Sequence, residues 1–292
     1  MKLADLNSVS RELPVLIAGP TASGKSALAL ELAARDGRLI VNADALQVFG
    51  CWRVLTARPS VAEEAALPHA LYGHVGREQV YSVGHWLREV AGLQDRKLVI
   101  VGGTGLNFSA LTGGLAAIPP VPAAVRAEAD ALRLSGGGLA AMVAGLDPET
   151  AGRIDLNNPM RVQRAWEVLR ATGRGLASWQ ESTAAPLLPL AAVEALVLRP
   201  TTPWLDDRIA RRFRAMVETG ALEEAEVARK FWAPPAPWTR AIGAPELIAH
   251  LEGRLTLEEA TAAGVLASRQ YAKRQRTWFR SRMAGWREVG PG

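Results

Sequence analysis

The chain has 292 residues, 49% of them apolar and 22% charged, a formal net charge of +5 and a single cysteine, Cys51. This length allows one large α/β domain, or one domain with an insertion, and a substantial core. One cysteine excludes an intrachain disulfide and a cysteine-based zinc site. Residues 1–12 lack the apolar centre of a signal peptide and no run of about 18 apolar residues occurs, so we expect a soluble, cytoplasmic protein with no membrane partner.

The first motif is the glycine-rich stretch Gly-Pro-Thr-Ala-Ser-Gly-Lys-Ser at residues 19–26, between an apolar run at residues 15–18 and a helix-like run at residues 27–32. The spacing G-x-x-x-x-G-K-[ST] in this context predicts a P-loop rather than a chance glycine turn. The backbone N–H groups of such a loop and the positive end of the following helix bind phosphates. Lys25 adds a cation and Ser26 offers a hydroxyl to Mg²⁺. The motif leaves open which phosphate compound is bound.

The next two predicted strands also end in polar or glycine-rich loops. Residues 39–41 lead to Asp44, and residues 97–101 lead to Gly-Gly-Thr-Gly with Thr104. Ligands of open parallel sheets bind beyond such carboxyl ends. Asp44 could accept a proton or orient a metal there, or it could simply cap a helix. The Thr104 hydroxyl can bond a phosphate oxygen, so we expect this loop to form a second wall of the P-loop pocket.

The middle of the chain has a different pattern. Prolines near residue 119 indicate an exit from the sheet, and residues 123–182 read as helices with no strand signal. We therefore predict an α/β fold: a P-loop NTPase-like parallel sheet flanked by helices, with a helical insertion at residues 119–190 and a core formed by residues 1–118 and 191–292. One insertion helix is expected to start after Asn158 and to carry Arg161 and Arg164 on one face.

The last third of the chain is expected to return to the sheet at residues 193–199 and to add a helix over residues 205–219. A final helix is predicted over residues 257–282, where basic residues recur at steps of four, three and four: Arg269, Lys273, Arg276 and Arg280. They form one stripe on the helix. No acid occurs between residues 266 and 287. A polyanionic partner and a merely solvated basic helix both explain this pattern.

Several motifs, in this order along the chain, resemble those of the bacterial tRNA dimethylallyltransferases: residues 19–26, 44–47, 56–59, 101–106, 161–164, 269–275 and 277–280. The resemblance covers about residues 13–282. It implies transfer of a dimethylallyl group from dimethylallyl diphosphate to N6 of adenine 37, next to the anticodon, with Mg²⁺ as cofactor. The implied partner is the anticodon stem-loop of tRNA, and we expect a monomer.

The resemblance also implies roles for individual residues. Asp44, Thr104 and Lys25 are the expected catalytic residues, with Asp44 as the base that accepts the N6 proton. Ser26 is expected to hold the metal. The expected diphosphate contacts are Gly19, Pro20, Thr21, Ala22, Ser23, Gly24, Lys25, Ser26 and Arg212. The expected tRNA contacts are Asp44, Ala45, Leu46, Gln47, Thr104, Arg126, Met160, Arg161, Val162, Gln163, Arg164, Arg240, Lys273 and Arg276.

The sequence departs from the family pattern at a few positions, and none of them is Lys25, Asp44 or Thr104. Ala45 stands where serine is frequent, Asn107 replaces a tyrosine and Met160 replaces a glutamine. Ala70 replaces a histidine, and Ala244-Pro245 interrupts an I-G-Y-x-E pattern. These departures concern the contacts with tRNA rather than the chemistry.

Other functions are compatible with a P-loop. A small-molecule kinase would bind a nucleoside triphosphate and would not need the basic final helix. A prenyltransferase acting on free adenine nucleotides would need neither that helix nor the insertion. An RNA-binding protein with an inactive P-loop would not need Lys25, Ser26 and Asp44 together.

Overall fold

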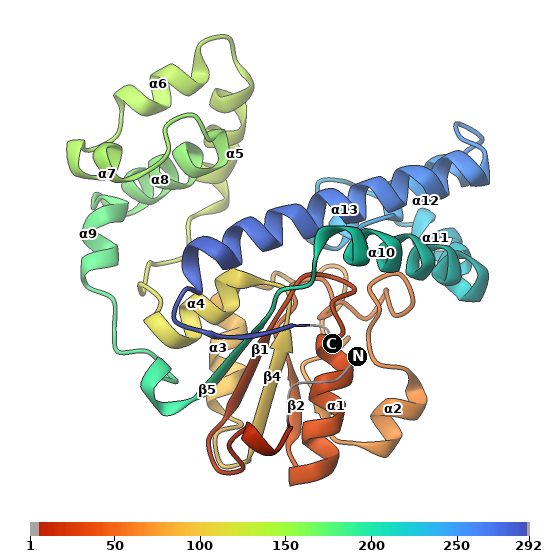
Figure 1. The fold of residues 1–292 in the computed structure, drawn as a ribbon. Helices are drawn as coiled ribbons and strands as arrows, with labels where there is room; N and C mark the ends of the chain where they lie inside the picture. The colour runs from red at the N-terminus through yellow and green to blue at the C-terminus, as the bar shows by residue number, and fades with distance from the viewer. Residues whose placement is uncertain (1–5, 291–292) are drawn as a thin grey trace. The chain divides into compact units, whose positions relative to one another are not determined.

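The computed structural model describes residues 6–290 and is built around a six-stranded sheet (Figure 1). The strand order is β3-β2-β4-β1-β5-β6 and every pairing is parallel. The strands are β1 (Val15–Ala18), β2 (Leu39–Asn42), β3 (His69–Ala70), β4 (Leu98–Gly102), β5 (Glu194–Leu198) and β6 (Arg287–Val289). The predicted parallel α/β sheet is confirmed.

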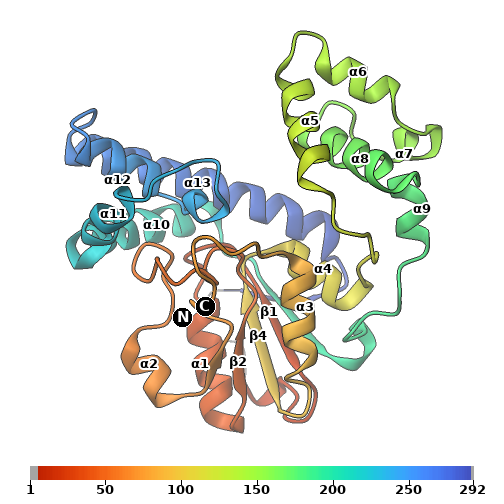
Figure 2. The ribbon, with the colours of Figure 1, turned by 180° about the vertical axis from the view of Figure 1, so that it is seen from behind.

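Both faces of the sheet are covered, which explains why its central strands are almost continuously apolar. On one face Val15, Ile17 and Ile40 pack against Leu28 and Leu32 of α1 (Lys25–Asp36). On the other face the alternate residues of the same strands pack against α3 (Val83–Ala91) and α4 (Gly105–Gly113). Helices α1 and α3 accordingly lie on opposite sides of the sheet in Figures 1 and 2.

A group of helices forms a separate apolar cluster with the loops that follow β2. It consists of α10 (Thr202–Met216), α11 (Leu222–Arg229), α12 (Ala244–Leu251) and α13 (Leu257–Arg282). The final helix has the predicted bounds, because Thr256 and Glu259 form a capping box at its start. The helix predicted over 205–219 instead spans 202–216. Pro203 lies in its first turn, and a π-helical turn, η3 (Val217–Ala221), ends it, with Gly220 at φ 127°.

The short elements complete this unit. They are α2 (Val61–Ala66) and the 3₁₀ turns η1 (Leu6–Ser8), η2 (Leu190–Ala192) and η4 (Pro237–Arg240). No helix of residues 6–290 is both long enough and apolar enough to cross a membrane.

The chain divides into two compact units, and the second covers Gly113–Pro186. It contains α5 (Ala123–Leu134), α6 (Gly138–Ala144), α7 (Pro148–Arg153), α8 (Pro159–Thr172) and α9 (Leu176–Glu181). Its borders fall a few residues before the expected 119 and 190. The chain rejoins the first unit early because Leu188 packs into the sheet core and its N–H donates to Leu111 O at 3.1 Å. As predicted, Asn158 caps α8 and accepts from Arg161 N–H.

The carboxyl ends of β1, β2 and β4 lie level with one another, because Ala18 pairs with Gly102 and Asn42 pairs with Val101. The loops after these strands therefore meet. Gly102 allows the closest approach: a Cβ at this position would lie 2.2 Å from the carbonyl carbon of Ala43. Only glycine fits there without a backbone shift.

We expect Gly102→Ala to lower the free energy of unfolding by about 1–3 kcal/mol, because the added methyl group forces β4 away from the loop after β2. Chemical denaturation measures this change. Gly152→Ala is the matched control, since a Cβ at Gly152 in α7 meets no atom within 4 Å. Equal stability of the two variants would contradict the close contact.

Candidate active site

Two residues at the tip of the P-loop have left-handed backbone conformations. Ala22 has φ 61° and Gly24 has φ 93°, and Gly24 caps the first turn of α1. The positive end of α1 therefore faces the loop, as an anion site requires. Ser23 is fully buried and its hydroxyl has no hydrogen-bond partner in the described chain. An unpaired buried hydroxyl is costly, so a bound phosphate oxygen would satisfy it.

Two half-buried cations face this loop. Lys25 Nζ lies 3.2 Å from Pro20 O, and Arg212 of α10 lines the same cavity. Burial lowers the pKa of Lys25 to about 8, with Arg212 contributing repulsion and Asp44 acting in the opposite direction. Burial and the neighbouring Arg208 lower the pKa of Arg212, again against the effect of Asp44. A bound anion would relieve this excess of desolvated positive charge.

The arrangement of Asp44 accounts for both sequence interpretations of this residue. Its Oδ1 accepts from Leu46 N–H at 3.0 Å, which caps a turn rather than a regular helix. Asn42 fixes the loop from the other side, since its Oδ1 accepts from Asp44 N–H and its Nδ2 donates to Asp44 O. Oδ2 makes no hydrogen bond within residues 6–290 and remains available as an acceptor. One oxygen thus positions the carboxylate and the other is free for chemistry.

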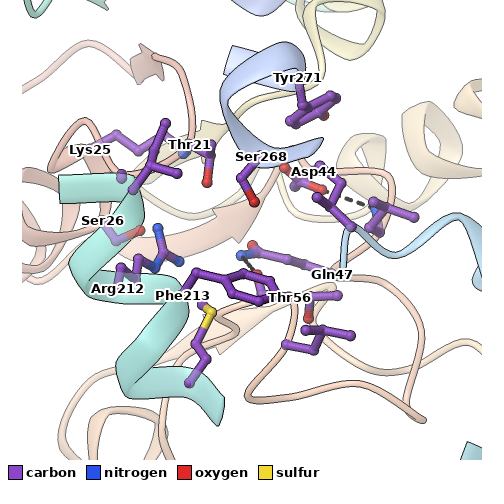
Figure 3. Close-up of a pocket in the computed structure, with 16 residues that line it drawn as sticks. Thr21, Lys25, Ser26, Asp44, Gln47, Thr56, Arg212, Phe213, Ser268 and Tyr271 are labelled. Atoms are coloured by element: carbon purple, nitrogen blue, oxygen red, sulfur yellow. Dashed lines mark hydrogen bonds between the residues drawn. The ribbon is translucent and has the colours of Figure 1, made fainter. Parts of the chain in front are cut away.

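Thr104 joins the glycine loop after β4 to the Asp44 loop. Its N–H donates to Ala43 O at 3.2 Å, and its Oγ1 accepts from Ala45 N–H at 2.9 Å. The cavity beside Asp44 is not lined by Thr104, so the second wall expected from this loop stays a prediction, and Thr104 acts on the site by holding the Asp44 loop. Figure 3 shows Asp44 and Tyr271 on one side of the pocket, opposite Lys25, Ser26 and Arg212.

Two aromatic residues of α13 have different surroundings. Phe279 is buried, but Tyr271 lines the cavity beside Asp44. Burial raises the pKa of Tyr271, and so does the nearby Asp44 carboxylate, while Thr104, Arg274 and Gln275 act in the opposite direction. Tyr271 is consequently a neutral phenol on the side of the pocket where Asp44 lies.

Apolar side chains form a further wall of this cavity next to the charged groups. They are Leu46, Leu55, Ile209, Phe213, Met216 and Ile242. A second cavity adjoins the first, since both are lined by Ala22, Lys25, Ser26, Gln47 and Arg212, and the second is also lined by Arg208 and Arg211. The site therefore combines an anion pocket, an apolar pocket and a free carboxylate.

Gln47 is less free than the sequence suggested. Its Nε2 donates to Thr56 O at 2.9 Å and to Ala57 O at 3.0 Å, which fixes the loop of residues 56–59. Both amide hydrogens are used, so only Oε1 is left for a ligand.

Two of the expected RNA contacts on α8 are buried instead. Val162 is 0% exposed and packs with Ala129 and Met142. Gln163 is 4% exposed, and its Nε2 donates to Asp130 and Glu167 while its Oε1 accepts from Arg133. These two residues hold the helical unit together and cannot reach a nucleic acid.

Other expected RNA contacts of the helical unit lie on its surface. Met160 is 58% exposed, and Arg161 and Arg126 are exposed. Burial lowers the pKa of Arg164, and repulsion from Arg126 adds to this effect against the attraction of Glu167. Arg126 and Arg164 are thus close enough to repel each other, and Arg164 also lies 3.8 Å from Glu167.

The basic stripe of α13 is exposed at Arg269, Lys273 and Arg280 and half-buried at Arg276. None of the four forms an ion pair with an acid of residues 6–290. Arg269 only donates to the backbone oxygen of Asp206, at 3.4 Å. The stripe is therefore left without acidic partners in the described part of the chain. Arg240, at the end of η4, is exposed too.

The fold and site define a class: a P-loop protein that places an anion pocket beside an apolar pocket and an unpaired carboxylate. A family model described as IPP transferase matches residues 47–282. Curated relatives called tRNA dimethylallyltransferase include one from Cereibacter sphaeroides, 69% identical over 278 residues, covering 94% of this chain and 95% of the relative. Another, from Dinoroseobacter shibae, is 62% identical over 296 residues, covering 100% and 99%.

Solved structures agree with this assignment. The tRNA isopentenylpyrophosphate transferase of Bacillus halodurans has a TM-score of 0.65 and 30% identity, covering 96% of this chain and 90% of that one. A eukaryotic dimethylallyltransferase acting on tRNA has a TM-score of 0.75 and 23% identity, covering 91% and 69%, and supports the fold alone. The chain belongs to the tRNA dimethylallyltransferase family of prenyltransferases, as its motifs predicted.

The lowered pKa of Lys25 leads to a prediction of proton uptake on anion binding. At pH 8 a large fraction of its side chains is neutral, because its pKa is about 8. Pyrophosphate favours the charged ammonium, so binding should take up a proton at pH 8 and much less at pH 6, where Lys25 is already charged. Calorimetry in buffers of different ionisation enthalpy measures this uptake.

Lys25→Met is the control for the protons that pyrophosphate itself exchanges. It should bind pyrophosphate more weakly and lose the extra uptake at pH 8. Identical uptake by the variant and the wild-type protein would mean that Lys25 does not contact the anion.

Proposed function

We propose that the chain transfers the dimethylallyl group of dimethylallyl diphosphate to N6 of adenine 37 of tRNA, next to the anticodon, and releases diphosphate. We further propose that it acts in the cytoplasm as a monomer. The observation that carries the proposal is the free Oδ2 of Asp44, opposite the cationic P-loop pocket and beside an apolar one. The names of the relatives support the choice of substrates.

The P-loop pocket accounts for the leaving group. As the bond between the allylic carbon and oxygen breaks, the electron pair goes to the diphosphate. Lys25, Arg212 and the N-terminal end of α1 lie where they stabilise this developing charge. Arg212 and the helix end are held in place before the substrate arrives, and Lys25 takes up any missing proton when the anion binds, so little reorganisation is required during the reaction itself.

The apolar wall accounts for the transferred group. A five-carbon allylic chain has no hydrogen-bonding groups, and Phe213, Ile209 and Leu55 offer it a matching surface next to Arg212. Exclusion of water from this wall would also protect the electron-deficient carbon from hydrolysis.

Asp44 accounts for the acceptor. The adenine N6 lone pair is delocalised into the ring, so N6 is a weak nucleophile until it loses a proton. In the proposed step, N6 forms a bond to the allylic carbon, the carbon–oxygen bond breaks, and an N6 proton passes to Asp44 Oδ2. Thr104 holds the Asp44 loop in place for this transfer through its bond to Ala45.

Mg²⁺ fits the same pocket, since it prefers a few protein oxygens and completes its shell with phosphate and water. Ser26, at the start of α1, lines both cavities and would hold it, next to the unpaired Ser23 hydroxyl. When bound, the ion supplies charge neutralisation of the diphosphate. The remaining steps depend on the chain's own residues.

The exposed basic surfaces account for the choice of an RNA acceptor. An adenine reaches a carboxylate inside a pocket only after it leaves its stack, which is easiest in a loop of RNA. We propose that four basic residues bind the phosphates of the stem-loop: Arg161, Arg164, Lys273 and Arg276. A free adenine nucleotide would leave these surfaces without a role, and a kinase would leave the apolar wall without one.

The direct test is to incubate the protein with dimethylallyl diphosphate and either an anticodon stem-loop or AMP, and to analyse the products by mass spectrometry. Addition of one dimethylallyl group to adenine 37 of the stem-loop supports the proposal. Addition to AMP alone, or phosphate transfer from ATP to a small molecule, would refute it.

Asp44→Asn keeps the shape of the side chain and its bond to Leu46 but removes the base. We expect turnover to fall by roughly 10²-fold or more, with little change in the affinity for the allylic diphosphate. Single-turnover kinetics measures the chemical step. The exposed Asp95, before β4, provides the control Asp95→Asn, which should be unchanged. Near-normal turnover of Asp44→Asn would remove Asp44 from the mechanism.

The double variants Arg161→Ala/Arg164→Ala and Lys273→Ala/Arg276→Ala test the RNA surfaces. Each lost phosphate contact should reduce the slope of log affinity against log salt by roughly 0.7–0.9. Melting temperature and affinity for the allylic diphosphate should change little. Arg88→Ala/Arg96→Ala removes the same charge from exposed positions on α3 and before β4. If tRNA binding responds to this control as much as to the test pairs, the assigned surfaces are wrong.

A further inference from the structure

One buried amide on α13 connects the two sides of the active site. Gln275 is 5% exposed. Its Oε1 accepts from the N–H of Thr21 in the P-loop at 2.9 Å, and its Nε2 donates to Gly103 O in the loop after β4, also at 2.9 Å. These partners belong to segments that are 254 and 172 residues away in the sequence.

The two bonds define the orientation of the amide without ambiguity. A backbone N–H must face the oxygen, and a backbone carbonyl must face the nitrogen. The backbone N–H of Thr21 is already hydrogen-bonded to Gln275, so it does not point at a phosphate. In an ordinary P-loop this backbone N–H would be expected to face the phosphate. Thr21 therefore contributes to the pocket through its side chain.

The Gly103 end of this bridge lies next to the proposed base. A Cβ on Gly103 would be 2.2 Å from Gln275 Nε2 and 3.2 Å from Asp44 Oδ2. Gly103 is followed by Thr104, which holds the Asp44 loop through Ala45. One side chain is thus bonded to the loop that faces the leaving group and to the loop that supports the acceptor carboxylate.

We propose that Gln275 is a positioning residue that sets the distance between the P-loop and the Asp44 carboxylate. The inference rests on the proposed prenyl transfer, in which the allylic carbon must lie between these two groups. Loss of the bridge should therefore reduce turnover more than substrate binding, because a displacement of about 1 Å costs on the order of 10²-fold in rate.

Two substitutions separate this role from others. Gln275→Met has a similar length and no hydrogen bonds, so turnover should fall on the order of 10²-fold at every pH. Gln275→Glu matches the amide only when its carboxyl group is protonated, since only then can it donate to Gly103 O. Burial and Asp44 favour the protonated form, as does bound diphosphate.

The turnover of Gln275→Glu relative to wild type should therefore rise as the pH is lowered from 8 to 6. The ratio cancels the titration of the groups that both proteins share, which are Asp44 after β2, Lys25 on α1, Tyr271 on α13 and Arg212 on α10. Gln94→Glu makes the same charge change at an exposed position before β4. The turnover of Gln94→Glu relative to wild type should not change between pH 8 and pH 6.

Binding of inorganic pyrophosphate provides a readout that does not depend on the acceptor. Calorimetry should show affinity within a few-fold of wild type for Gln275→Met, and a smaller loss for Gln275→Glu at pH 6 than at pH 8. Melting temperature is recorded for each variant. If the wild-type protein binds pyrophosphate but modifies no stem-loop, the proposed function fails, and the pH response of pyrophosphate binding still decides whether Gln275 fixes the P-loop.

Three results would overturn the inference. Gln275→Met with wild-type turnover would show that the bridge sets no distance. A ratio for Gln275→Glu that does not change with pH would show that the bond to Gly103 is irrelevant. A parallel loss of melting temperature, turnover and pyrophosphate affinity in both variants, at every pH, would reduce Gln275 to a residue that only stabilises the fold.

Discussion

The site depends on the close contact between the ends of β4 and β2. Gly102 brings β4 so near to the backbone of Ala43 that no side chain fits between them, and the pairing with β1 brings the P-loop to the same edge. A parallel sheet with level carboxyl ends gathers three loops in one place. Lys25 at the start of α1 and Arg212 of α10 line the cavity at this edge, and this enclosure partly desolvates both.

The electrostatic state of the pocket is a consequence of that enclosure. Two basic groups are desolvated with a single facing carboxylate, so the free protein holds an unfavourable excess of positive charge. Folding sustains it because the apolar strands β1, β2 and β4 are completely buried beneath the site. The folding free energy of the sheet thus holds the two basic groups in a desolvated state, and binding of an anion relieves it.

Much of this could be predicted from the sequence because the information is local. The P-loop lies within eight residues, and the final helix carries its own capping box, so its bounds were correct. The buried positions on α8 were missed although helical periodicity places residue 162 on another face than 161. Gln275 could not be assigned, because its partners are distant in sequence and only the fold brings them together. The place of Tyr271 beside Asp44 could not be assigned for the same reason.

The helical unit leaves the sheet and returns to it at a single place, where Leu188 N–H binds Leu111 O. In the topology of the first unit, residues 113–186 are one closed loop inserted between two neighbouring positions. Such a loop can lengthen, shorten or change its charge without altering the register of any strand. The proposed RNA contacts on α5 and α8 can therefore change without disturbing the sheet, whereas those on α13 belong to the unit that holds the diphosphate and share its geometric constraints.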